Sequence, residues 1–176
     1  LPCDNGEGES SLNIQIASDL HIEFYGIYKR IPKDIIIPSA PVLALLGDIG
    51  LTFTELLRTF IHEQSKRFEH VIVIAGNHEF YNARISSGVH DVAEQLSWMR
   101  QICKEKDNIH FLEKETIELN GVLICGTTLW SYIPKSQRKN AERCMNDYQI
   151  CFAPPDYDAD DKTKEEGGAR NQRLRP

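Results

Sequence analysis

Residues 12–21 read LNIQIASDLH, residues 42–48 read VLALLGD and residues 71–79 read VIVIAGNHE. Each stretch is an apolar run of strand length that ends in a short polar cluster. The first run alternates apolar and polar residues, and the other two are continuously apolar, as strands buried on both faces are. In open α/β sheets, ligands bind outside the carboxyl ends of the strands. We therefore expect the three polar clusters to meet at one edge of a sheet.

The segments that follow these runs predict helices. Residues 52–68 carry an apolar stripe at helical spacing, and Thr52 and Glu55 have the spacing of a capping box. Residues 89–103 carry a second stripe, which follows Ser86 and Ser87 as expected N-caps. Both helices are predicted to be amphipathic and to cover a sheet.

A short strand and a hairpin are predicted farther along the chain. Residues 109–112 form the strand, and residues 116–119 and 122–125 form a hairpin whose two-residue turn is Asn120-Gly121. In this register Leu119 faces Val122 and Ile117 faces Ile124. The order of elements predicts an α/β fold with a mostly parallel sheet flanked by helices plus one β-hairpin.

Composition excludes several classes of protein. A chain of 176 residues with 41% hydrophobic content is expected to form one globular domain with a real core. The net charge of −6 argues against nucleic acid as a partner. No apolar run is long enough for a membrane span, and the first residues do not resemble a signal peptide. Five cysteines without C-x-x-C spacing favour a reducing compartment, so we expect a cytoplasmic protein.

Composition also predicts the boundaries of the folded part. Residues 1–11 are acidic and glycine-rich, and we expect them to be flexible. Residues 12–150 carry all the periodic segments and form the predicted domain. Beyond Cys151 the sequence turns to Pro154-Pro155, then acidic and finally basic residues, with almost no large apolar side chain. We expect residues 151–176 to be a disordered tail, because they bury too little apolar surface to offset their ordering entropy.

The polar clusters hold four side chains suited to metal ions. Asp19 and Asp48 offer carboxylates, His21 offers an imidazole, and Asn77 offers an amide oxygen. This mixture suits divalent ions such as manganese, iron or zinc better than it suits a calcium cage or a thiolate zinc cluster. We therefore predict a metal site at the sheet edge.

The order D-x-H, G-D and G-N-H-E resembles the calcineurin-like metallophosphoesterase family, over residues 12–150. The resemblance implies a partial metallophosphoesterase sandwich that binds two divalent ions and hydrolyses phosphate mono- or diesters, with a small phosphate ester as substrate. By this resemblance Asp19 and His21 hold one metal, Asp48 bridges both metals, and Asn77 holds the second. His78 would act as the acid that protonates the leaving group.

The family pattern continues with two later histidine motifs, whereas this chain has no histidine after His110. We therefore expect the second metal site to be incomplete and the chain to be a fragment of such an enzyme. The alternative is a catalytically impaired remnant that only binds metal or phosphate. A third class, an unrelated α/β nucleotide-binding module, fares worst, because neither G-x-G-x-x-G after the first strand nor a Walker motif occurs. Nothing in the sequence indicates an oligomeric state.

Glu79 and the histidines outside the motifs are expected to have structural roles. Glu79 follows the predicted acid, and we expect it to hydrogen-bond the backbone of its loop. The histidines outside the motifs are expected to be structural; they are His62, His70, His90 and His110. The stretch Met145-Asn146-Asp147-Tyr148 resembles one in some bacterial-type and protist members of the family, and the sequence assigns it no role.

Overall fold

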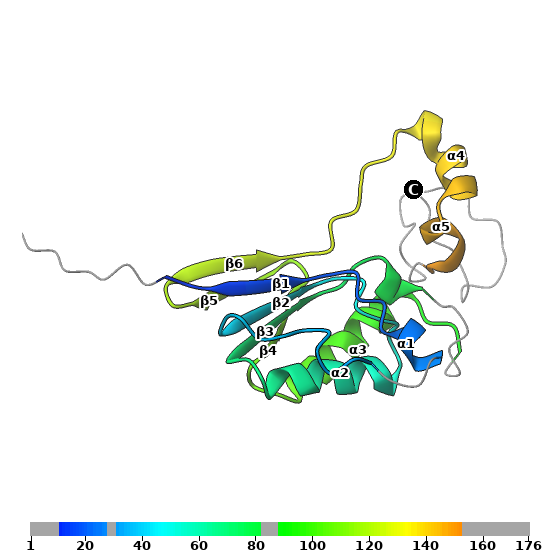
Figure 1. Ribbon diagram of the computed structural model, residues 1–176. Helices are drawn as coiled ribbons and strands as arrows, with labels where there is room; N and C mark the ends of the chain where they lie inside the picture. Colours follow the sequence, from blue (N-terminus) through cyan, green and yellow to red (C-terminus); the bar gives the residue numbers. More distant parts are fainter. Residues whose placement is uncertain (1–10, 28–30, 82–87, 153–176) are drawn as a thin grey trace, which may run out of the picture.

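The computed structural model describes residues 11–27, 31–81 and 88–152, and its centre is a four-stranded parallel sheet (Figure 1). The strands lie in chain order: β1 (Ile14–Ala17), β2 (Val42–Leu46), β3 (His70–Ile74) and β4 (Ile109–Phe111). Ile16 of β1 pairs with Ala44 of β2, which pairs with Ile72 of β3. The predicted parallel sheet is therefore confirmed, and the carboxyl ends of all four strands point the same way.

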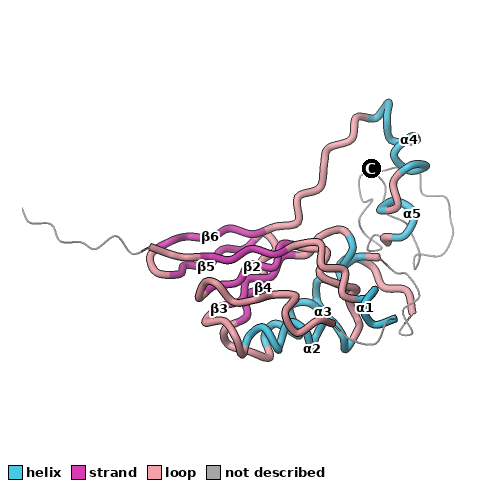
Figure 2. Tube along the Cα trace, viewed as in Figure 1, coloured by secondary structure: helices cyan, strands magenta, loops and turns pink. Residues whose placement is uncertain are grey.

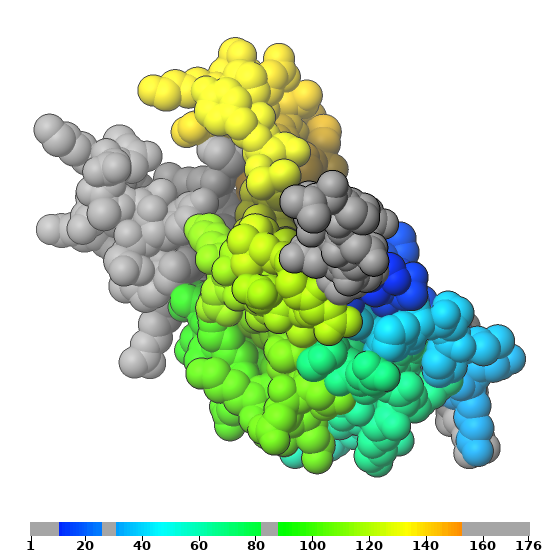
Figure 3. Space-filling model, turned by 90° about the vertical axis from the view of Figure 1, so that its left-hand side faces the viewer, coloured from blue at the N-terminus to red at the C-terminus, as the bar shows by residue number. Residues whose placement is uncertain are grey.

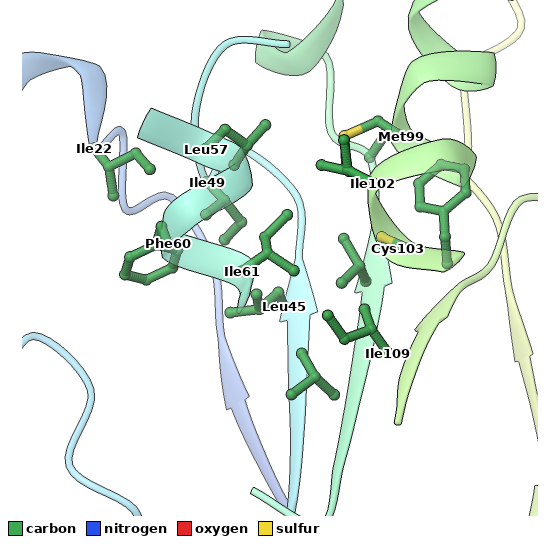
Figure 4. Packing of buried hydrophobic residues seen from close by; sticks show 14 of the residues in the cluster. Ile22, Leu45, Ile49, Leu57, Phe60, Ile61, Met99, Ile102, Cys103 and Ile109 are labelled. Carbon is green, nitrogen blue, oxygen red and sulfur yellow. The ribbon is translucent and has the colours of Figure 1, made fainter. Parts of the chain in front are cut away.

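Helices cover one face of this sheet. Helix α1 (Glu23–Ile27) follows β1, and α2 (Glu55–Ser65) and α3 (Val92–Lys104) follow β2 and β3. Figure 4 shows how their side chains meet the strands: Ile61 of α2 lies over Leu45, and Cys103 of α3 lies on the side of Ile109. Burial of these apolar side chains removes them from water and fixes both helices on the sheet.

The hairpin covers the opposite face. Strands β5 (Glu115–Leu119) and β6 (Val122–Gly126) pair in the predicted register, with Leu119 opposite Val122. Leu119, flanked by Ile117 and Ile124, packs on residues of that face, which include Val42, Ala44, Ile72 and Leu112. Ile16 of β1 is 69% exposed, which shows that the hairpin leaves part of this face uncovered. The predicted α/β fold with one hairpin is confirmed.

Both helix starts differ from the predicted ones. Thr54, not Thr52, caps α2 by accepting a hydrogen bond from Leu57 N. Asp91 caps α3 in a capping box with Glu94, so this helix begins later than expected. The expected caps Ser86 and Ser87 lie outside the described residues. The capping-box spacing pointed to Thr52, but the side chain of Thr52 is used in a tertiary contact.

After β6 the chain runs in extended form to two short helices, as the tube in Figure 2 shows. The elements are a 3₁₀ turn (Lys135–Gln137), α4 (Arg138–Cys144) and α5 (Asp147–Ile150). In the space-filling view α4 (yellow) stands clear of the hairpin and the sheet (Figure 3). Cys151 is fully buried, and the carbonyl of Phe152 accepts a hydrogen bond from Val92 N. The folded part thus includes these first two residues of the predicted tail, whereas 153–176 lie outside the described residues, as do 1–10.

None of the helices in the described ranges has the length and apolar character that crossing a membrane requires.

Candidate metal centre

The three polar clusters meet at the carboxyl edge of the sheet. Backbone hydrogen bonds join the first two loops: Asp19 N donates to the Gly47 carbonyl (3.1 Å) and His21 N to the Asp48 carbonyl (3.0 Å). The third loop joins them through His78 N, which donates to Asp48 Oδ1 (2.9 Å). Asp48 therefore lies between the other two clusters, which is the place a shared ligand needs.

Asp19, His21 and Asp48 offer one ligand atom each, and these atoms all lie within 4.8 Å of one another. Two carboxylates and an imidazole form a donor set that suits manganese, iron or zinc. The structure thus brings three of the four predicted ligands together, and their chemistry fits a divalent ion. Their assigned roles remain predictions.

The backbone at these three residues is in an unfavourable conformation. Asp19, His21 and Asp48 have φ angles of 55°, 44° and 54°, which lie in the left-handed region that residues other than glycine rarely adopt. Such residues cost on the order of 1–3 kcal/mol each and persist where the surroundings impose them, often at functional sites. The hydrogen bonds between the loops are what impose them here.

Two glycines allow the loops to approach so closely. A Cβ at Gly47 would lie 2.6 Å from the Cα of Gly76, and a Cβ at Gly76 would lie 2.3 Å from Asp48 Oδ1. Any side chain at Gly76 would therefore displace the Asp48 carboxylate. Both motifs need glycine at these positions because a side chain would collide with the neighbouring loop.

Glu79 holds the loop that carries Asp48, as the sequence predicts. Its Oε2 accepts from Asp48 N (2.9 Å) and Gly76 N (2.7 Å), and its Oε1 accepts from Ile49 N (2.7 Å) and Gly50 N (3.2 Å). Burial raises the pKa of Glu79, and the backbone N–H donors oppose that rise. The main-chain carbonyl of Glu79 also accepts from the Thr52 hydroxyl, which explains why Thr52 does not cap α2.

Glu23 is a residue of the site that the sequence analysis missed. It begins α1 and lies 2.9 Å from Nδ1 of His78 and 3.6 Å from Nδ1 of His21. The hydrogen bond to Glu23 raises the pKa of His78 above its ordinary value, against the effect of burial. Burial raises the pKa of the Glu23 carboxyl, but the hydrogen bond and the charge of His78 lower it, and the resulting pKa lies below the ordinary value. The pair therefore favours a protonated His78 beside a carboxylate.

Asn77, the fourth predicted ligand, has a partner from a distant part of the chain. Its Nδ2 donates to Asp147 Oδ1 (2.7 Å) and to the Tyr81 hydroxyl (3.1 Å). Asp147 is 8% exposed. Nothing in the sequence around Asp147 marks it as part of the site, because an acidic residue is common in the first turn of a helix for reasons of helix electrostatics alone. The same holds for Glu23.

The four other histidines have partners away from this edge. His62 Nε2 lies 2.8 Å from the carbonyl of Ile102, and His70 pairs with His110 (3.1 Å). His90 stacks on Phe53 with 3.6 Å between ring centroids. Within the described residues, none of these side chains joins the groups that can hold a metal ion.

Comparisons with known proteins bear on the family and the fold of the chain. A family model described as calcineurin-like phosphoesterase matches residues 12–161. An uncharacterised protein of Acanthamoeba polyphaga mimivirus is 30% identical over 149 residues, which are 78% of this chain and 51% of that protein. The crystal structure of a phosphopantetheinyl hydrolase from Mycobacterium tuberculosis superposes with a TM-score of 0.57 at 16% identity, covering 81% of this chain and 55% of that one. The chain spans about half the length of each relative.

Proposed function

The chain belongs to the calcineurin-like phosphoesterase family, and on that basis we propose that it is a metal-dependent hydrolase of phosphate mono- or diesters that uses two divalent ions. The observation that carries the proposal is the set of ligand atoms from Asp19, His21 and Asp48 within 4.8 Å. The proposed substrate is a small phosphate ester, since the net charge of −6 disfavours a polyanion.

Each predicted ligand has a proposed place. Asp19 and His21 would hold one ion, Asp48 would bridge to the second, and Asn77 would complete what this chain offers the second ion. Manganese, iron and zinc fit these donors. When bound, a pair of such ions supplies charge neutralisation and an activated water for attack on phosphorus.

His78 would supply the proton for the leaving group. It is half-buried, and its Nδ1 lies against Glu23, which favours the protonated ring. A protonated imidazole beside the phosphate can donate to the departing alkoxide, a step worth about 10² to 10⁴-fold in rate. Glu23 would in turn hold the ring in place through this ion pair, in which its Oε1 lies 2.9 Å from Nδ1 of His78.

A second candidate is a catalytically impaired protein that binds metal or phosphate. The observation in its favour is the ligand count within this chain: Asp48 and Asn77 are the two residues proposed for the second ion. The two candidates differ in whether a bound metal is accompanied by turnover.

The test uses the purified chain with Mn²⁺ and two esters, phenyl phosphate and 4-nitrophenyl phosphate. The proposal expects His78→Ala to lower kcat by about 10² to 10⁴-fold for phenyl phosphate and by less for the nitrophenyl ester, whose leaving group needs no proton. Metal content should stay unchanged. His110→Gln, which alters a histidine outside the site, is the matched control. Loss of metal in His78→Ala would show that His78 is a ligand, and metal binding without turnover in the wild type would favour the second candidate.

For its cellular setting we propose the cytoplasm. The described cysteines are all free, and two of them, Cys103 and Cys151, are buried as thiols. Free thiols are typical of a reducing compartment. A thiol titration of protein purified without reductant tests this, since disulfide formation at these positions would contradict it.

A further inference from the structure

We infer that Asp147 is a positioning residue for the metal centre, because it fixes the side-chain amide of Asn77 so that the amide oxygen faces the metal ions. The inference rests on the proposed function, which makes Asn77 a ligand. It also gives a role to the stretch Met145-Asn146-Asp147-Tyr148, to which the sequence alone assigns none.

Asp147 is held firmly against the body of the protein. It begins α5, and the residues after it are anchored: Cys151 is fully buried, and the carbonyl of Phe152 accepts from Val92 N (2.9 Å). Tyr148 and Ile150 pack against the main core. A chain segment that is 70 residues away from Asn77 in the sequence is thus brought to the metal centre and fixed there.

The chemistry of the contact sets the direction of the amide. The NH₂ group of Asn77 is the branch that faces Asp147, because its Nδ2 donates to the carboxylate oxygen Oδ1 at 2.7 Å. The oxygen of the same amide then points to the other side. An amide nitrogen has no lone pair to offer a cation, so an amide rotated by 180° would be no ligand.

Tyr81 completes the arrangement. Its hydroxyl accepts from the same Asn77 Nδ2 (3.1 Å) and lies 3.5 Å from Asp147 Oδ1. Both protons of the Asn77 amide group therefore have acceptors, and its rotation would leave the buried Asp147 carboxylate facing an oxygen.

Asp147 has no cationic side chain as a partner within the described part of the chain. None of the ion pairs found among those residues includes it. A buried carboxylate without a lysine or arginine is costly unless other groups compensate its charge. Hydrogen bonds from Asn77 and the Tyr81 hydroxyl compensate part of this charge, and a divalent ion at the proposed centre would compensate more.

The test measures the affinity for Mn²⁺, by electron paramagnetic resonance of the free ion, in four variants. Asp147→Leu removes the acceptor at similar volume and should weaken binding about 10- to 100-fold, the usual effect of losing a group that orients a ligand. Asn77→Asp should also weaken binding, because two carboxylates would then face each other. The double variant Asn77→Asp/Asp147→Asn exchanges the two groups, restores a donor against an acceptor, and should recover most of the affinity. Glu142→Leu, at an exposed acidic residue of α4, is the control and should bind as the wild type does.

Several outcomes would overturn the inference. A folded Asp147→Leu that binds Mn²⁺ like the wild type would do so, and so would an exchange variant that binds no better than Asn77→Asp. If Asp147→Leu does not fold, the comparison of the exchange variant with Asn77→Asp decides the question, because the exchange variant keeps both hydrogen-bonding groups.

Failure of the proposed function has a different signature. If the wild type itself binds no Mn²⁺, the metal centre is refuted, and the orientation of Asn77 is read instead by NMR. Side-chain NH₂ protons of Asn77 that are protected from exchange in the wild type and unprotected in Asp147→Leu would support the positioning contact. Equal protection in both would contradict it.

Discussion

Substitution of Glu79 by Gln tests how the site is held together. Each carboxylate oxygen of Glu79 accepts two backbone N–H groups, from residues 48–50 and 76. Gln keeps one oxygen and two of these bonds, but its NH₂ group would face the other two N–H donors. A hydrogen bond to a charged acceptor contributes about 1.5–3 kcal/mol, so losing two should lower the free energy of unfolding by about 3–6 kcal/mol.

That loss would be a large share of the roughly 5–15 kcal/mol that stabilises a typical domain. The assay is urea unfolding followed by far-ultraviolet circular dichroism. Glu118→Gln, at an exposed position of β5, is the matched control and should change stability by less than about 0.5 kcal/mol. If Glu79→Gln is as stable as Glu118→Gln, then the four hydrogen bonds do not hold the loop, and the account of how Asp48 is positioned is wrong.

Three further predictions address the loops, the hairpin and pH. Gly76→Ala would place a Cβ 2.3 Å from Asp48 Oδ1 and should sharply weaken Mn²⁺ binding in a dialysis assay, whereas Gly88→Ala, which is strained at φ 104° but meets nothing within 4 Å, should leave binding intact. Leu119→Ala should cost about 2–5 kcal/mol of unfolding free energy, and Leu123→Ala, 65% exposed, far less; equal losses would show that the hairpin does not pack as described. Burial and the neighbouring His70 lower the pKa of His110 below its ordinary 6.5. The unfolded chain therefore takes up this proton first as pH falls, so stability should drop below about pH 6.5. His110→Gln should lose less stability than the wild type between pH 7 and pH 5 in urea titrations, and an equal loss would contradict this.

The sequence predicted the sheet well because its signal is local. Continuous apolar runs at 42–46 and 71–75 are typical of strands buried on both faces of a parallel sheet, and the turn Asn120-Gly121 sets the register of Leu119 against Val122. Both statements depend on neighbouring residues alone. The placement of Asp19, His21 and Asp48 followed from the topology, since each comes directly after a strand.

What the sequence did not predict depends on contacts between distant residues. Thr52 and Thr54 both suit a helix start, and the bond from Thr52 to the Glu79 carbonyl decides which one caps α2. Glu23 and Asp147 are ordinary acidic residues at helix starts until His78 and Asn77 are placed beside them. Partners of this kind can be identified only in a three-dimensional structure, because nothing in their sequence spacing distinguishes them from charged residues on the surface.

The most direct test of the metal centre is the metal content of the purified chain after incubation with Mn²⁺ and gel filtration, measured by mass spectrometry. The account predicts that the wild type and Asp107→Ala, a control at an exposed residue, retain metal equally. Asn77→Ala should retain less, and Asp48→Ala should retain least, because Asp48 is the residue proposed to bridge both ions. Equal metal content in all four proteins would contradict the central claim.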